Sequence, residues 1–107
     1  MPFEETLTVT VLAEETASSV FVSGEVDVFS VPRLSSAISR EIDSGKRQIV
    51  VDLAGVTFID AFSLDVLVAL TVAANAAGSD LSLRNPSPQF SRVRQLVDSR
   101  RVLHVEQ

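Results

Sequence analysis

The chain has 107 residues, a formal net charge of −5 at pH 7 and no cysteine. This length indicates one domain, residues 1–107, and 46% hydrophobic against 21% charged residues is ordinary for a globular protein. The negative charge argues against nucleic acid as a main partner, because that binding depends on cations facing phosphates. The absence of cysteine excludes disulfides, thiolate nucleophiles and cysteine metal sites.

The sequence also predicts where the protein is found. Its N-terminus is acidic and lacks the basic and apolar regions of a secretory signal peptide. The most apolar stretch, residues 61–77, is short for a membrane span, and Asp60 and Asp65 would lie at its start. We therefore expect a cytoplasmic protein without a membrane partner.

Two strands are predicted at the start of the chain. Residues 7–12 alternate threonine with aliphatic residues, which favours a strand with one buried face. Residues 20–22 form a second apolar run that ends at Gly24. A pair of neighbouring strands of this kind is compatible with a hairpin.

A surface helix is predicted next. Ser30 is a credible N-cap, and Pro32 falls in the first turn, where a missing amide hydrogen costs nothing. Apolar residues then recur at helical spacing as far as Ile42, and Gly45 ends the helix.

The central part of the chain predicts a buried strand followed by a buried helix. Residues 49–53 are aliphatic apart from Asp52, and residues 61–77 are apolar on most sides of a helix. Asp60 is a preferred N-cap, because its carboxylate accepts a hydrogen bond from the first turn, and Gly78 ends the helix. Side chains at this strand-to-helix connection are candidates for function.

The last part of the chain predicts a strand over residues 80–84, a helix that starts after Ser87, and a terminal strand over residues 102–106. The order of elements is therefore β-β-α-β-α-β-α-β. Alternating strands and helices predict an α/β fold with parallel strands, and the N-terminal pair adds an antiparallel part.

Two motifs carry a family resemblance. The segment GEVDVFSVPRL, residues 24–34, resembles the G-E-V-D segment of STAS domains, in which a serine or threonine leads into a helix. The segment VVDLAGVTFIDAFSLDVLVAL, residues 50–70, resembles the strand, the D-S-S-G motif and the helix of the same family. The resemblance implies a STAS-like mixed β-sheet with three to four α-helices.

The resemblance also implies a function. STAS proteins of this type include bacterial anti-sigma factor antagonists, which bind an anti-sigma factor, a serine-protein kinase of the ATP-binding fold, and so release a sigma factor. The kinase phosphorylates a serine of the D-S-S-G motif and breaks the complex. The added phosphate carries about −1.5 to −2 charges at neutral pH, which disfavours rebinding next to carboxylates.

The sequence departs from the motif at the switch itself. When Asp60 is aligned with the aspartate of the motif, Phe62 falls on the usual phosphoacceptor serine and Ser63 on the glycine. Phenylalanine has no hydroxyl, so the usual phosphorylation is not expected there. Ser63 is the remaining candidate for phosphorylation, although a merely structural role in the first helical turn is favoured.

Candidate partner-binding residues follow from the two motifs: Glu25, Asp27, Ser30, Asp60, Phe62 and Asp65. Each has an alternative, structural interpretation. For Asp60 this is the role of helix N-cap, and for Phe62 it is a place in the hydrophobic core. We favour an exposed Phe62 that anchors a partner.

No enzyme, cofactor or metal site is predicted. His104 is the single histidine and is expected at the surface, and the sequence contains no glycine-rich phosphate loop or HExxH motif. The preferred hypothesis is an antagonist-like module without the usual phosphorylation. The alternative is a STAS domain that acts as a ligand sensor or oligomerisation scaffold, and a homodimer is compatible with either hypothesis.

Overall fold

The computed structural model describes residues 7–106. The predicted acidic N-terminal segment and the predicted domain, residues 1–107, extend beyond the described residues. The described residues form one five-stranded sheet with the strand order β1-β2-β3-β4-β5, together with three helices. The strands are β1 (Leu7–Ala13), β2 (Ala17–Val26), β3 (Gln48–Ile59), β4 (Asp80–Arg84) and β5 (His104–Val105). The helices are α1 (Val31–Asp43), α2 (Ala61–Ala76) and α3 (Pro88–Val97).

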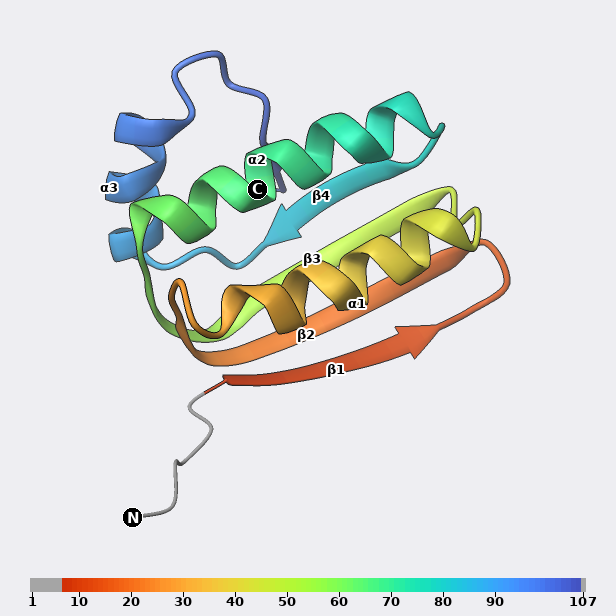
Figure 1. Cartoon of the computed structure of the whole chain (residues 1–107), viewed down its shortest axis with the longest axis horizontal. Coiled ribbons are helices and arrows are strands. Elements are labelled where there is room, and N and C mark those ends of the chain that lie inside the picture. Colours follow the sequence, from red (N-terminus) through yellow and green to blue (C-terminus); the bar gives the residue numbers. More distant parts are fainter. Residues whose placement is uncertain (1–6, 107) are drawn as a thin grey trace.

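The sheet is mixed, as predicted. β1 and β2 pair antiparallel in a regular register that runs from Leu7 opposite Gly24 to Ala13 opposite Ser18. The pairs β2–β3, β3–β4 and β4–β5 are all parallel. Figure 1 shows this order, with β1 at one edge of the sheet and the C-terminal part of the chain at the other.

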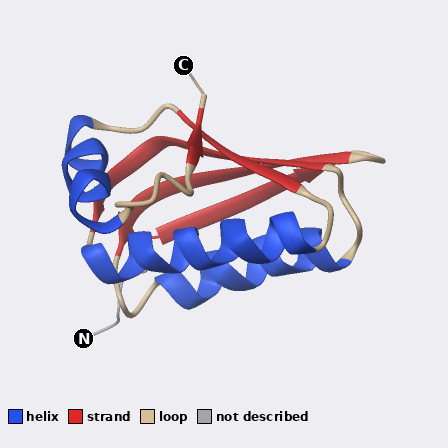
Figure 2. Cartoon of the chain, turned by 90° about the horizontal axis from the view of Figure 1, so that it is seen from above, coloured by secondary structure: helices blue, strands red, loops and turns tan. Residues whose placement is uncertain are grey.

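The two longer helices cover one face of the sheet. Figure 2 shows α1 and α2 side by side beneath the strands, whereas α3 stands at one end of the molecule. The core lies between this helical layer and the sheet, because alternate strand residues such as Val20 and Val51 pack against the helices. The helices contribute fully buried residues that include Leu34, Ile38 and Leu67. This two-layer packing explains the apolar character of α2, which contacts α1, α3 and β4.

The central strands are longer than the sequence predicted. β2 continues past Gly24 to Val26, and β3 continues past Leu53 to Ile59. The alternation of buried and exposed residues along these strands is interrupted, because the β2–β3 register shifts twice. Gly55 fits one of these irregularities, since a Cβ built there would lie 2.5 Å from the Ser23 Cβ.

The terminal strand is shorter than predicted. β5 contains only His104 and Val105, because the preceding residues are held by Asp98 instead of a neighbouring strand. The Asp98 carboxylate accepts hydrogen bonds from the main-chain amides of Val102, at 2.7 Å, and Leu103, at 2.9 Å. His104 is exposed, as expected, with its Nδ1 3.8 Å from a carboxylate oxygen of Asp80.

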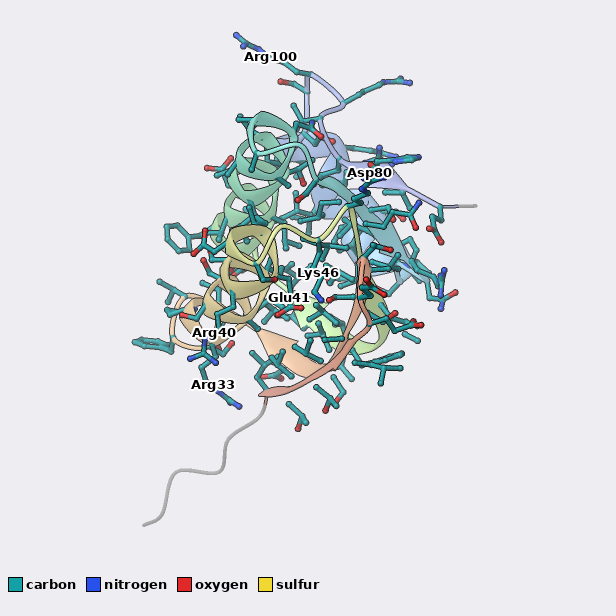
Figure 3. All side chains as sticks on the ribbon, turned by 90° about the vertical axis from the view of Figure 1, so that its right-hand side faces the viewer. Arg33, Arg40, Glu41, Lys46, Asp80 and Arg100 are labelled. Carbon is teal, nitrogen blue, oxygen red and sulfur yellow. The ribbon has the colours of Figure 1, made fainter. Side chains whose placement is uncertain are left out.

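Polar contacts fasten the end of the sheet at which β2 and β3 begin. The Ser18 hydroxyl donates a hydrogen bond to Glu41 at 2.5 Å, and the Lys46 ammonium donates to the main-chain oxygen of Glu14. Figure 3 looks onto this end of the molecule and shows Glu41 and Lys46 near each other. The opposite end of the sheet carries the connections from strand to helix, and there Arg33 of α1 donates a hydrogen bond to the Leu7 carbonyl oxygen at 2.8 Å.

Within residues 7–106, no helix is both long enough and apolar enough to cross a membrane. The helices α1 and α3 are not apolar enough, and α2, Ala61–Ala76, is too short.

Candidate functional site

The two motifs meet at one end of the sheet. Because β2 and β3 are parallel and Val26 lies opposite Ile59, the connections that follow them leave the sheet at neighbouring points. The Asp60 amide donates a hydrogen bond to the Val26 carbonyl oxygen at 3.1 Å, which joins the two connections directly. We call residues 27–30 and 60–62 together the corner surface, and Figure 1 shows both connections at the same end of the molecule.

The first connection is a turn closed by Asp27 and Ser30. One Asp27 carboxylate oxygen accepts hydrogen bonds from the amides of Phe29 and Ser30, both at 3.0 Å. The Ser30 hydroxyl accepts a bond from the Asp27 amide at 3.0 Å and donates to the Glu25 carbonyl at 3.1 Å. The two side chains therefore hold each other's main chain in place.

This network corrects the predicted role of Ser30 as a capping side chain. Ser30 occupies the N-cap position of α1, but its hydroxyl makes no capping hydrogen bond to the helix. The Asp27 carbonyl oxygen instead accepts a bond from the Val31 amide at 2.8 Å. The hydroxyl is already engaged with Asp27 and Glu25, and this explains the difference.

The turn presents two apolar side chains to solvent. Phe29 is 90% exposed and Val28 is 48% exposed. Neither residue was predicted from the sequence as partner-binding. The available signal was their position, since they are apolar residues in a strand-to-helix connection, outside the stripe that begins at Val31.

The second connection is fixed by Asp60, and the predicted N-cap is confirmed. The Asp60 carboxylate accepts a hydrogen bond from the Ser63 amide at 2.7 Å, and the Asp60 main chain is extended, as an N-cap requires. In the first turn of α2, Phe62 is 56% exposed, so its side chain is not part of the core.

Ser63 differs sharply from its neighbour. Its side chain has 0% exposure, and its hydroxyl has no hydrogen-bond partner among the described residues. A kinase can reach this hydroxyl only if the first turn of α2 opens. Phosphorylation of Ser63 therefore stays a prediction, and the buried position is an argument against it.

Acidic residues lie within four positions of each exposed aromatic residue in the sequence. Glu25 is exposed next to the first connection, and Asp65 is exposed one helical turn after Phe62. Asp27 and Asp60 are half-buried, and the carboxylates of both accept hydrogen bonds from main-chain amides. The structure thus gathers all the predicted partner-binding residues at one end of the sheet but gives Asp27, Ser30 and Asp60 structural contacts.

Residues 7–106 contain no group of three or more His, Cys, Asp or Glu side chains that could hold a metal ion. The corner surface exposes the aromatic residues Phe29 and Phe62, a residue type that is enriched in protein interfaces.

The fold and this site define the class of protein. A family model of the STAS domain matches residues 9–107, and the chain belongs to that family.

Particular relatives are similar to this chain over most of their length. The anti-sigma-B factor antagonist of Staphylococcus aureus is 28% identical over 88 residues, which cover 82% of this chain and 82% of that protein. Among solved structures, an anti-sigma factor antagonist from Mycobacterium paratuberculosis has a TM-score of 0.80 and 24% identity and covers 92% of this chain and 84% of that chain. The phosphorylated form of the Bacillus cell fate determinant SpoIIAA has a TM-score of 0.69 and 19% identity, with 94% and 91% of the chains covered. These likenesses to solved structures support the fold.

Proposed function

We propose that this protein is an anti-sigma factor antagonist that binds an anti-sigma factor, a serine-protein kinase of the ATP-binding fold, through the corner surface. The observation that carries the proposal is the pair of exposed aromatic side chains at one end of the sheet, Phe29 on the β2–α1 connection and Phe62 in the first turn of α2. Exposed aromatic residues are preferred anchors of protein interfaces, because they bury a large area at a small entropic cost.

The charge around the two anchors supports the same proposal. Glu25 and Asp65 are exposed beside them and add a negative field at the surface. Such a field favours a basic docking surface on the partner and raises the rate of association at low salt. Asp27 and Ser30 contribute by holding the turn that presents Phe29.

The proposal includes loss of the usual off-switch. Phe62 occupies the position that aligns with the acceptor serine of the family motif, and the neighbouring Ser63 hydroxyl is buried. Binding would then be insensitive to the phosphorylation reaction that normally ends the interaction. The protein has no catalytic activity in this proposal and acts in the cytoplasm.

The test is a pull-down from a lysate of the source organism, with ADP and with ATP, on immobilised wild-type protein and a Phe62→Ser variant. We expect wild type to retain a kinase of the ATP-binding fold under both nucleotides, and Phe62→Ser to lose it with ATP because an acceptor hydroxyl is restored. Failure of both proteins to retain such a kinase would contradict the proposal.

The two aromatic anchors can be tested against a matched control. Phe29→Ala should weaken the captured complex about thirtyfold, the loss that corresponds to an interface hot spot of about 2 kcal/mol. Phe21 is the control, because it is 43% exposed but lies in the middle of β2, in a shallow depression lined by Thr10 and Asp52. Phe21→Ala should leave the affinity unchanged.

One observation favours the alternative, an oligomerisation scaffold. β1 is an edge strand without a charged residue or proline, and its Val11 and Leu12 side chains are 37% and 58% exposed. Edge strands of this kind pair readily with another chain. Light scattering coupled to size-exclusion chromatography tests the scaffold, because the scaffold requires a stable homodimer or larger assembly and a strictly monomeric protein would rule it out.

A further inference from the structure

One side chain of α3 reaches the end of β3 directly before the corner surface. The Gln89 amide oxygen accepts a hydrogen bond from the Ile59 main-chain amide at 3.0 Å. The Gln89 amide nitrogen donates to the Ile59 carbonyl oxygen at 2.8 Å. A single side chain thus satisfies both main-chain groups of one strand residue.

These two bonds replace a missing strand. On one side β3 pairs with β2 as far as Ile59, but on the other its pairing with β4 ends at Asp52 opposite Arg84. Beyond that point no strand lies on the β4 side of β3 within residues 7–106. Gln89 supplies the donor and the acceptor that a neighbouring strand would have offered at Ile59.

Gln89 is itself held firmly. Ser87 caps α3, because its hydroxyl accepts a hydrogen bond from the Phe90 amide at 3.0 Å. Phe90 is 1% exposed and belongs to the hydrophobic core, so the first turn of α3 is anchored on both sides of Gln89. The main chain from which the Gln89 side chain extends is therefore fixed.

We propose that Gln89 is a positioning residue for the corner surface, an inference that rests on the proposed function. Ile59 precedes Asp60, whose amide bonds to Val26 and whose carboxylate caps α2. Fixing Ile59 therefore fixes the start of α2 and the direction in which Phe62 leaves the connection. The geometry links α3, an element outside both sequence motifs, to the partner-binding site.

The first test uses the isolated protein and needs no partner. Gln89→Leu keeps a side chain of similar size but removes both hydrogen bonds. We expect the amides of Asp60 and Ser63 to exchange with deuterium at least about tenfold faster than in wild type, while the Val51 amide in the middle of β3 is unchanged. Unchanged exchange at Asp60 and Ser63 in the folded variant would overturn the proposal.

Two further variants separate positioning from general destabilisation. Gln95→Leu makes the same substitution at an exposed position of α3 and should leave all three exchange rates as they are. Gln89→Glu keeps an acceptor for the Ile59 amide but loses the donor, so it should give an intermediate increase at Asp60 and Ser63. It also provides a measurable variant if Gln89→Leu does not fold. An increase at Asp60 and Ser63 caused equally by Gln95→Leu would refute a specific role of Gln89.

The second test connects the residue to binding. With the kinase captured by the wild-type protein as the probe, Gln89→Leu should weaken binding about tenfold, and the effect should vanish when Phe62 is already alanine. Equal effects of Gln89→Leu in both backgrounds would overturn positioning through Phe62. If exchange accelerates as expected but no kinase is captured, Gln89 positions the connection and the proposed function alone fails.

Discussion

Replacing Ser63 by alanine should make the protein more stable. The Ser63 hydroxyl is fully buried and has no partner among the described residues, and an unpaired buried hydroxyl costs about 1–3 kcal/mol. The hydrogen bond to the Asp60 carboxylate comes from the Ser63 main chain and is retained in the variant. A small void left by the missing oxygen offsets part of the gain, so we expect the free energy of unfolding to rise by about 1 kcal/mol.

Thermal and urea unfolding, followed by circular dichroism, measure this change. For a domain of this size, about 1 kcal/mol corresponds to an increase in Tm of about 4 °C. Ser79→Ala is the matched control, because Ser79 is also buried but its hydroxyl donates to the Lys46 carbonyl oxygen at 2.6 Å. That variant should lose about 1 kcal/mol. A lower stability of Ser63→Ala would show that the hydroxyl has a partner and would refute the reasoning.

Three further predictions concern the cap, the irregular strand and a surface ion pair. Asp60→Ala should lower the free energy of unfolding by about 1 kcal/mol in urea, and Asp60→Asn by less, because asparagine still caps a helix; equal losses would contradict the capping role. Gly55→Ala should lower it by about 1–3 kcal/mol, since the new Cβ would lie 2.5 Å from the Ser23 Cβ, and an unchanged urea midpoint would show that the strand adapts. The hydrogen bond from Arg84 holds the pKa of Glu106 below its ordinary 4.5, so this contribution to stability is present above pH 4.5 and is lost as the pH falls through the lowered pKa. Carboxyl chemical shifts should show a Glu106 midpoint below 4.5 that Arg84→Gln raises, and a midpoint insensitive to that substitution would refute the cause.

Most of the fold could be predicted because the hydrophobic periodicity was clear. α2 begins after Asp60 and ends before Gly78, as predicted, since a strong cap and a glycine with positive φ mark its ends. The full length of β3 could not be predicted, because the register shifts near Gly55 break the alternation between buried and exposed residues. β5 was predicted too long, because the Asp98 carboxylate takes the main-chain amides of Val102 and Leu103 that a longer strand would use.

The candidate site was predicted in part. Its location and the exposure of Phe62 agree with the resemblance to the family. Phe29 was missed, because the sequence does not reveal that Asp27 and Ser30 bond to each other's main chain and leave the two residues between them exposed. Gln89 was missed for a different reason, since its contact with Ile59 depends on how α3 returns to the sheet.

The parallel register of β2 and β3 determines which molecules of this protein a partner can bind. The two halves of the corner surface become neighbours only after the chain has completed the crossover through α1, so an unfolded or partly folded chain does not carry the surface at all. A partner that binds there selects native molecules and stabilises them by mass action. At a free concentration of 100 times its Kd, it would add about 2.7 kcal/mol to the free energy of unfolding. Loss of the partner would then lower the abundance of this protein as well as its activity.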